Sequence, residues 1–208
     1  MFEQTISTEM LLLMQKLSSI DEIKNHFYLA GGTALALQYG HRKSEDLDFF
    51  TQTIFDVEKL SQLILSLDGT MISEEKGTLH VMVNHVKLSF LHYPYPVLQP
   101  FKQFVGLQIA SLEDIACMKA VAISQRGEKK DFYDMYEILK HIKPLHLKQL
   151  FLTKYSQQKI NCYHILKSFF YFEDAEKLPE PVILDGTAWT EVKAFFVKKE
   201  SILTEELC

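Results

Sequence analysis

The sequence predicts an α+β protein in which a mixed β-sheet flanked by helices is followed by a C-terminal helical part. Short apolar runs suited to strands fall between residues 27 and 92, and segments with helical periodicity separate them. From residue 111 onward only helical periodicity recurs. Such a change along the chain is typical of α+β folds. We therefore expect a head over residues 1–110 and a helical part over residues 111–208 that completes a cleft beside the sheet.

Composition and charge exclude several classes of protein. Of the 208 residues, 47% are hydrophobic and 24% are charged, which is ordinary for a globular protein and unlike a disordered chain. The net charge is −5, so no overall basic field attracts nucleic acid. Any contact with RNA would use local basic stretches such as residues 41–43 and 129–130.

The sequence also indicates where the protein works. No apolar run approaches the ~18 residues that a membrane span needs. Glu3 and the lack of a basic segment around it predict no signal peptide. The cysteines, Cys117, Cys162 and Cys208, are far apart and odd in number, so they predict neither a zinc site nor a disulfide framework. A reducing cytoplasm is the expected compartment.

The first fifty residues predict two helices and two strands. Residues 5–25 carry apolar side chains at helical spacing and predict one amphipathic helix. Residues 27–30 predict a short strand, and residues 33–38 predict a helix of small side chains. Gly40 is placed to end that helix, because glycine readily adopts the left-handed conformation after a last turn. Residues 46–50 predict the next strand.

The middle of the chain should extend the sheet. Residues 55–67 predict an amphipathic helix. Residues 71–76, 80–84 and 86–92 predict three strands, and Pro94 ends the last one because proline has no N–H to donate to a neighbouring strand.

The remaining residues predict helices. Ser111 followed by acidic residues predicts a capped helix start, and that helix should run to about Gln125. Residues 131–140 predict the next helix. Further helices are expected from residue 145, with a last short one over residues 190–199.

Residues 28–50, YLAGGTALALQYGHRKSEDLDFF, combine two features suited to a nucleotide. Gly31 and Gly32 permit close backbone approach at a helix start, where free N–H groups hold phosphate. Asp46 and Asp48 lie two residues apart on a strand, so both side chains project to one face. Two carboxylates this close repel each other unless a cation lies between them, and Mg²⁺ is the natural partner. A plain turn and a solvated strand edge are the alternative.

The same stretch resembles the signature of the polymerase-beta-like nucleotidyltransferase superfamily, and more closely that of its AbiEii/AbiGii toxin family. The positions that carry this resemblance lie in the first motif and in two later ones. They are Gly31, Gly32, Leu35, Ala36, Tyr39, Gly40, Arg42, Ser44, Asp46 and Asp48, then Lys119, Ala122, Arg126, Asp131 and Asp134. The resemblance covers roughly residues 28–136 and implies a nucleotidyltransferase head.

The resemblance also implies an activity and partners. Members of such a family move a nucleoside monophosphate from a nucleoside triphosphate (NTP) to an acceptor hydroxyl with the help of Mg²⁺. RNA, notably tRNA, is the acceptor class that the resemblance suggests. A separately encoded antitoxin is the implied protein partner, which makes the chain a toxin-like component of a toxin–antitoxin or phage-defence system.

By the same resemblance, Asp46 and Asp48 would hold Mg²⁺ and act in catalysis. The residues expected to bind the nucleotide are small or basic: Gly31, Gly32, Thr33, Arg42, Ser44 and Lys119. The backbone of the two glycines and the Thr33 hydroxyl would hold the outgoing phosphates. Lys119 and Arg42 would add positive charge beside them.

Two acidic residues and two basic residues of the later motifs have competing interpretations. Lys119 lies in a mostly apolar helix, where an exposed position is the alternative to a site residue, since lysine is rarely buried unless paired. Asp131 is a catalytic candidate, but it could equally be a helix N-cap or an ion-pair partner of Lys119 or Arg126. Arg126 and Asp134 are expected to pair and to hold their two helices together.

One position departs from the superfamily pattern. Its enzymes carry a third acidic residue on a neighbouring strand, and the corresponding residue here is Ser89. A serine hydroxyl cannot replace a carboxylate ligand or a strong base at neutral pH. Either the site works with Asp46, Asp48, Lys119 and Asp131, or the chain is an impaired nucleotide- or RNA-binding module that keeps the fold. Ser89 should lie on a strand beside the predicted strand that carries Asp46 and Asp48 (the acidic strand), and its side chain should point to the same face of the sheet as theirs.

Overall fold

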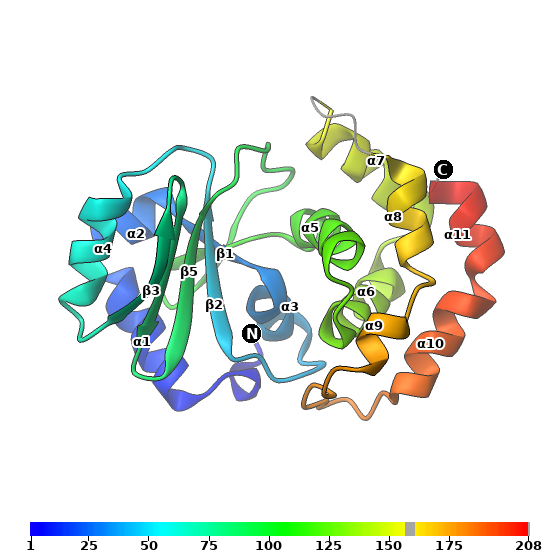
Figure 1. Ribbon diagram of the computed structural model, residues 1–208, viewed down its shortest axis with the longest axis horizontal. Coiled ribbons are helices and arrows are strands. Elements are labelled where there is room, and N and C mark those ends of the chain that lie inside the picture. The colour runs from blue at the N-terminus through cyan, green and yellow to red at the C-terminus, as the bar shows by residue number, and fades with distance from the viewer. Residues whose placement is uncertain (157–160, 208) are drawn as a thin grey trace.

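A mixed seven-stranded sheet forms the centre of the head in the computed structural model, which describes residues 1–156 and 161–207 (Figure 1). The strand order is β3-β4-β5-β2-β1-β7-β6. The bounds are Tyr28–Ala30 (β1), Asp46–Thr51 (β2), Thr70–Glu75 (β3), Thr78–Val83 (β4), Val86–His92 (β5), Lys102–Phe104 (β6) and Leu107–Ile109 (β7). Since β2 runs parallel to β5 and antiparallel to β1, the predicted α+β class with a mixed sheet is confirmed.

Helices cover both faces of this sheet. They are α1 (Thr8–Ser18), α2 (Asp21–His26), α3 (Gly31–Tyr39) and α4 (Val57–Leu65), with a short 3₁₀ turn at Glu3–Thr5. Figure 1 shows α1, α2 and α4 on one face, and α3 with α5 on the other. In β2, Leu47 and Phe49 are buried toward the first face, whereas Asp46 and Asp48 alternate with them and are only partly buried. This alternation places both carboxylates on the α3 side.

The prediction of one helix over residues 5–25 is wrong, because the chain divides there into α1 and α2. Ile20 has extended backbone angles, φ −98° and ψ 109°. The hydroxyls of Ser18 and Ser19 donate to the carbonyl of Gln15, which is how serine side chains compete with helix continuation. The apolar spacing continues across the break, so periodicity alone did not reveal it.

Strands β6 and β7 were not expected. Each has only three residues, too few for a periodic pattern, and a tight turn at Val105 and Gly106 with φ of 44° and 84° joins them. Strand β7 pairs in parallel with β1, and Ile109 lies opposite Leu29. This pairing delivers the chain to the start of α5 beside the first strand.

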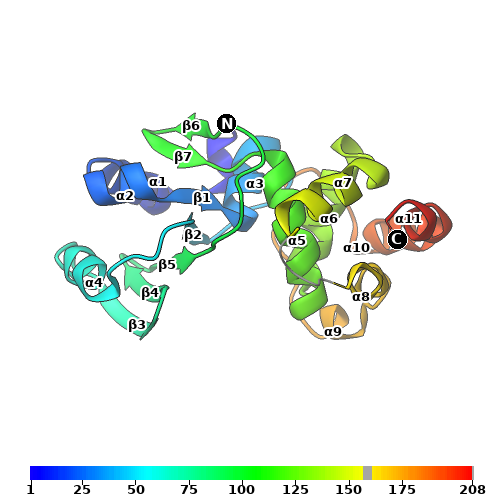
Figure 2. The same cartoon turned by 90° about the horizontal axis from the view of Figure 1, so that it is seen from above.

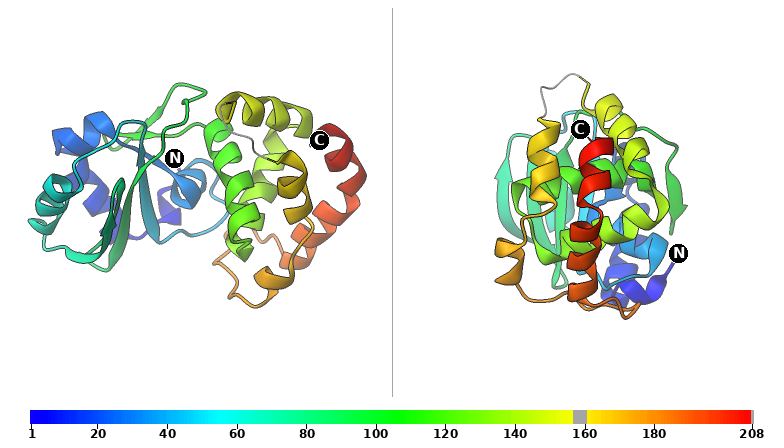
Figure 3. Two further views of the ribbon diagram at one scale, coloured as in Figure 1. Left: turned by 45° about the horizontal axis from the view of Figure 1, so that its top comes forward. Right: turned by 90° about the vertical axis from the view of Figure 1, so that its right-hand side faces the viewer.

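The helical part contains α5 (Leu112–Gln125), α6 (Lys129–His141), α7 (Pro144–Lys154), α8 (Cys162–Ser168), α9 (Glu173–Glu176), α10 (Trp189–Lys198) and α11 (Glu200–Leu207). The Ser111 hydroxyl accepts the N–H of Asp114, so the predicted N-cap is confirmed. The predicted last helix is not the last, because α11 follows α10 after a break at Lys199. Figures 2 and 3 show α10 and α11 on the side of this part away from the sheet. None of the helices in the described ranges is both long and apolar enough to cross a membrane.

The chain returns from the helical part to the head between α9 and α10. The N–H of Lys43 donates to the carbonyl of Val182 at 2.8 Å, and the N–H of Leu184 donates to that of His41 at 2.9 Å. Arg42 and Ile183 form an isolated antiparallel bridge between these two bonds. Residues 182–184 thus tie the far end of the chain to the segment between α3 and β2.

A buried ion pair makes a second connection. Lys154 of α7 is fully buried; its Nζ lies 2.6 Å from Oδ1 of Asp114 in α5 and donates to the carbonyl of Pro96 at 2.8 Å. The Asp114 carboxylate also accepts the N–H groups of Leu98 and Gln99. One charge pair therefore joins α5, α7 and the loop that follows β5.

Lys154→Met should lower the free energy of unfolding by about 3–5 kcal/mol, because the Asp114 carboxylate would stay buried without its cation. Urea denaturation measures the change. Lys148→Met on the same helix is the control, since Lys148 is partly exposed. Equal stability of the two variants would show that the buried pair does not hold these segments together.

Candidate active site

An open cleft of about 440 Å³ lies between the sheet and the helical part. Its sheet wall comes from β2, β4 and β5, and its other walls come from the start of α3, from α5 and from the start of α6. Segments from three distant parts of the sequence therefore meet in this cleft. Most of the residues expected to act on a nucleotide line it.

Asp46 and Asp48 both line the cleft from β2, and both are partly exposed. Within the described ranges, neither carboxylate forms an ion pair or a side-chain hydrogen bond with the protein, and no cluster of three or more histidine, cysteine or acidic residues could hold a metal. Two neighbouring carboxylates without a basic partner fit Mg²⁺, which takes one or two carboxylates and completes its shell with water and phosphate oxygens.

The two glycines bring backbone close to functional side chains. Gly31 has φ of 68°, and a Cβ there would lie 3.0 Å from Oδ2 of Asp48. A Cβ on Gly32 would lie 2.2 Å from Nη2 of Arg42, a separation that real atoms do not reach. Ala30, the N-cap residue of α3, offers no side-chain oxygen to the first turn. The free N–H groups at this helix start are therefore available to an anion.

Two residues expected to hold phosphate, Thr33 and Arg42, line the cleft, and their side chains also make contacts within the protein. Arg42 is buried; its Nε and Nη2 donate to the two carboxylate oxygens of Asp134 at 2.7 and 2.8 Å, and its Nη1 donates to the carbonyl of Lys43. The Thr33 hydroxyl donates to the backbone carbonyl of Asp46 and lies 2.8 Å from Oγ of Ser44. Thr33 thus fixes α3 against β2, and Arg42 fixes the segment before β2 against α6. Both residues line the cleft, as Ser44 does.

Lys119 lies on the cleft wall but is nearly buried, with 4% of its surface exposed. Its Nζ lies 2.9 Å from Oδ1 of Asp131 and 2.5 Å from Oδ2 of Asp134. The alternative of a solvent-exposed helical lysine is therefore wrong. Lysine tolerates this burial because two carboxylates offset the loss of water around its charge.

Asp131 forms ion pairs with both of the partners expected for it, Lys119 and Arg126. Arg126 donates from Nε and Nη2 to the two oxygens of Asp131 at 2.8 and 2.9 Å, so the expected pair of Arg126 with Asp134 is wrong. Glu128 is the N-cap residue of α6, which excludes the N-cap hypothesis for Asp131. Asp131 is fully buried behind Lys119, and it is not among the described residues that line the cleft.

Burial on its own would raise the pKa of Asp131, but attraction to Lys119 and the hydrogen bonds from Arg126 lower that pKa to about 2. Burial would also raise the pKa of Asp134, and attraction to Arg42 and Lys119 holds it well below its usual range. Both carboxylates are therefore ionised at neutral pH.

These charges leave a positive excess beside the acidic strand. Three cations, Arg42, Lys119 and Arg126, face two carboxylates, Asp131 and Asp134, so the cluster carries one more positive than negative charge. Arg126 is the accessible member, with 48% of its side chain exposed, and it lines the cleft. It is thus a stronger candidate for a phosphate ligand than the buried Arg42, and its place at the end of α5 was the available sequence signal.

Strand pairing brings further side chains to the acidic pair. Ser89 lies opposite Asp48 and Lys87 lies opposite Asp46 in the parallel pairing of β2 with β5, which is the register expected for Ser89. His80 of β4 lies opposite Ser89. His80, Lys87 and Ser89 all line the cleft. Neither His80 nor Lys87 was singled out from the sequence. Strand alternation places Lys87 on the same face as Ser89, whereas only the pairing of β4 with β5 brings His80 there.

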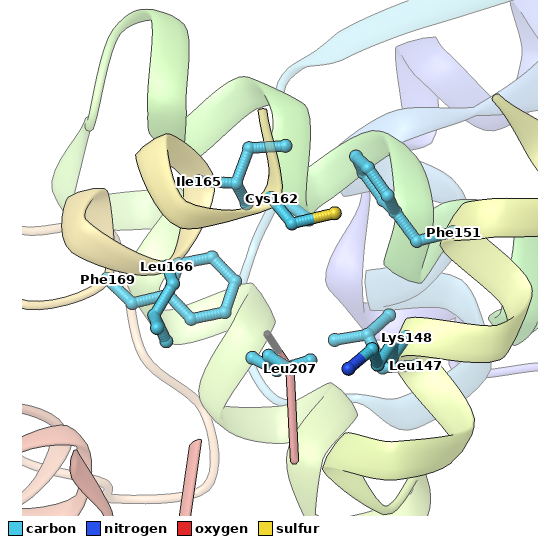
Figure 4. Close-up of a pocket in the computed structure, with 9 residues that line it drawn as sticks. Leu147, Lys148, Phe151, Cys162, Ile165, Leu166, Phe169 and Leu207 are labelled. Atoms are coloured by element: carbon cyan, nitrogen blue, oxygen red, sulfur yellow. The ribbon is translucent and has the colours of Figure 1, made fainter. Parts of the chain in front are cut away.

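A second, smaller cavity lies within the helical part. Figure 4 shows apolar side chains converging on it, among them Phe151, Ile165 and Leu166. Its volume is about 20 Å³, so it has room for about one water molecule and none for a nucleotide. The larger cleft is the candidate active site.

A mixed sheet whose acidic strand lies beside a Gly-Gly helix start in such a cleft defines a nucleotidyltransferase fold. Solved structures agree. The nucleotidyltransferase toxin MenT4 of Mycobacterium tuberculosis superposes with a TM-score of 0.62 at 16% identity, covering 94% of this chain and 82% of that one. JHP933 of Helicobacter pylori gives 0.57 at 18% identity, with 97% and 94% covered. The antibiotic-resistance factor ANT(2'')-Ia gives 0.54 at 15% identity, with 72% and 92% covered.

The sequence assigns the chain to a family within this class. The family model described as nucleotidyl transferase AbiEii toxin, type IV toxin–antitoxin system, matches residues 12–195. The chain belongs to this family and is a nucleotidyltransferase, which confirms the resemblance found in its motifs. An uncharacterized protein of Aquifex aeolicus (strain VF5) is 45% identical over 185 residues, covering 85% of this chain and 87% of that protein.

The lowered pKa of Asp131 predicts a pH dependence of stability. The fall from the usual 3.8 to about 2 means that the ionised form contributes ~2 kcal/mol above pH 4. That contribution is lost as the pH falls from 4 to 2. Parent and Asp131→Asn should therefore differ most in unfolding free energy at pH 6, and the difference should narrow by ~2 kcal/mol near pH 2. Urea denaturation across this range measures it, and a gap that does not change with pH contradicts the ion-pair assignment.

Proposed function

We propose that this chain is a Mg²⁺-dependent enzyme that transfers a nucleoside monophosphate from an NTP to a hydroxyl of RNA, notably tRNA, as the toxin of a toxin–antitoxin or phage-defence system. The observation that carries the proposal is the pair Asp46 and Asp48, unpaired with any cation of the described residues, directly beside the helix start at Gly31 and Gly32. The family supports an antitoxin as protein partner. Free thiols at Cys117 and Cys162 agree with a cytoplasmic setting.

The phosphates fit the polar end of the cleft. N–H groups at the start of α3 would bind the phosphate oxygens, and Arg126 and Lys130 would add charge on the opposite wall. Asp46 and Asp48 would hold Mg²⁺, which offsets phosphate charge when bound. The nearly buried ammonium group of Lys119 would attract the phosphates electrostatically from the cleft wall. Asp131 would hold Lys119 and Arg126 in position.

The nucleoside fits the other end. Along β2, Phe50 follows Asp46 and Asp48 on the same face, and Leu91, Tyr93 and Met118 continue an apolar wall. A ribose and base need such a surface, on which aromatic side chains can stack. The cleft is therefore charged at one end and apolar at the other, which matches the triphosphate and the base of a nucleotide.

The acceptor could approach along a neighbouring groove of about 360 Å³. It shares Ser44 and Asp46 with the cleft, and Lys43, Lys129 and Lys130 line it. Local basic side chains of this kind suit a phosphate backbone even on a chain with net charge −5. Acidic side chains also line the groove, so its positive field is confined to these lysines.

Asp48→Asn should abolish label transfer from NTP to RNA and weaken Mg²⁺-dependent NTP binding, because one of the two metal ligands loses its charge. The assay incubates purified protein with Mg²⁺, total RNA and each labelled NTP in turn. Asp68→Asn, an exposed turn residue with φ of 62°, is the matched control and should behave as the parent. Transfer at the parental rate by Asp48→Asn would refute the proposed metal site.

A second candidate, the impaired binding module, is favoured by one observation. Ser89 lies opposite Asp48 on the cleft side of β5, where a third acid would complete the site. Such a module would bind NTP or RNA through the same cleft and transfer nothing.

Ser89→Asp separates the two candidates. In a working enzyme the extra negative charge beside Asp48 should leave transfer unchanged or lower it, since it repels the triphosphate. In an impaired module the same change should raise transfer from zero, because a positioned base contributes ~10²–10⁴-fold. Label transfer by parent and variant is compared at equal Mg²⁺. A silent parent with an active Ser89→Asp variant would decide for the module.

A further inference from the structure

Three side chains form a row across the sheet wall of the cleft. Asp48 of β2, Ser89 of β5 and His80 of β4 are register partners in successive strands, and all three line the cleft. Figure 2 shows these strands side by side. Two strand spacings, about 10 Å, separate the backbones of Asp48 and His80. The side chains at the two ends of the row can therefore act on the same bound group from opposite sides.

Ser89, the middle residue of the row, forms a hydrogen bond with the imidazole of His80. Nδ1 of His80 lies 3.1 Å from Oγ of Ser89, and Ser89 is buried with 3% of its surface exposed. When Nδ1–H donates to Oγ, the other ring nitrogen, Nε2, keeps its lone pair. The ring itself is half-buried on the cleft wall. Ser89 thus orients a neutral histidine whose second nitrogen can accept a proton.

The other charged groups of the cleft are less suited to that task. Asp46 and Asp48 would be occupied by the metal ion. Lys119 and Arg126 carry protons and cannot accept one. Glu128 also lines the cleft, but it pairs with Lys130 at 3.0 Å and approaches Arg126 at 3.8 Å. The Glu128 carboxylate is therefore already engaged by two cations.

We propose that His80 is the general base of the transfer and that Ser89 is the residue that positions it, an inference that rests on the proposed function. Nε2 of His80 takes the proton of the acceptor hydroxyl as the hydroxyl oxygen bonds to the α-phosphorus. The bond from the α-phosphorus to its bridging oxygen breaks, and that electron pair leaves with pyrophosphate. The imidazolium then releases the proton to water. Histidine suits this role because its pKa lies near neutral pH.

Several charged groups share the surroundings of His80 and shape its pH dependence. Strand β3 places uncharged Ser73 directly opposite His80, with Glu75 two residues further along. The remaining charges line the cleft from the segment before β2, from β2, β5 and α5, and from the start of α6: Arg42, Asp46, Asp48, Lys87, Lys119, Arg126, Glu128 and Lys130. Because a general base must be unprotonated to act, kcat of the parent should rise from acidic toward neutral pH.

His80→Ala should lower kcat by about 10²–10⁴-fold, the usual contribution of a positioned base. Binding of each NTP with Mg²⁺, measured without acceptor, should change by less than about threefold, because a base acts on the acceptor in the transition state. Added imidazole should restore part of the rate. His80→Gln should lose the rise of kcat with pH. His146→Ala, which removes an exposed histidine on α7, is the matched control and should keep the parental rate.

Ser89→Ala tests the positioning role. It should lower kcat less than His80→Ala does, while NTP binding is kept. The double variant should be no slower than His80→Ala alone, because residues that act as a unit have non-additive effects. Additive losses would overturn the positioning role of Ser89.

The outcomes separate this inference from the proposed function. An active parent whose His80→Ala and His80→Gln variants keep both kcat and the pH profile would overturn the role of His80 alone. Loss of NTP binding in both variants would likewise overturn it, since His80 would then be a binding residue. A parent that transfers no nucleotide to RNA from any NTP would overturn the proposed function, and the base assignment with it.

Discussion

The buried contacts of Asp134 are the interaction on which the rest of the structure depends. Its carboxylate accepts Arg42 in a bidentate pair and also contacts Lys119 and His41, so one side chain of α6 holds the segment before β2 and the helix α5. Removing water from these charges is costly, and only their close pairing offsets that cost. The pairing also explains Gly32, because a larger residue there would displace the Arg42 guanidinium from the carboxylate.

This network sets the electrostatics of the cleft as well as its shape. The cluster around Asp134 carries one excess positive charge, and the acidic strand opposite carries two unpaired carboxylates. Under the proposed function, an NTP with its metal ion would complement both walls, with its phosphates beside Arg126 and its cation beside Asp46 and Asp48. The buried members Lys119 and Asp131 keep the accessible Arg126 in place, and a charge held in one position stabilises a bound anion more strongly than a mobile surface charge does.

The two walls of the cleft differ in how firmly they are held. Asp48, Ser89 and His80 lie on three hydrogen-bonded strands, whose register fixes their spacing. The helical wall is held to the head by two sets of side-chain contacts, those of Asp134 and those of the Lys154–Asp114 pair. Backbone hydrogen bonds of residues 182–184 add a third connection. In the proposed mechanism, the groups that would act on the reacting atoms thus belong to the sheet, and the cations that would bind phosphate belong to the helical wall.

Local patterns in the sequence determined most elements of the head, the shared face of Asp46 and Asp48, the N-cap at Ser111 and the motifs that identify the family. Each depends on residues only a few positions apart, where strand alternation and capping act. Tertiary structure alone decided that Arg42 binds Asp134, that Arg126 binds Asp131, and that His80 lies beside Ser89. It also added β6 and β7, which are too short for a pattern. Ion-pair partners and strand neighbours are chosen by packing between distant segments, and any basic residue satisfies the local rules equally well.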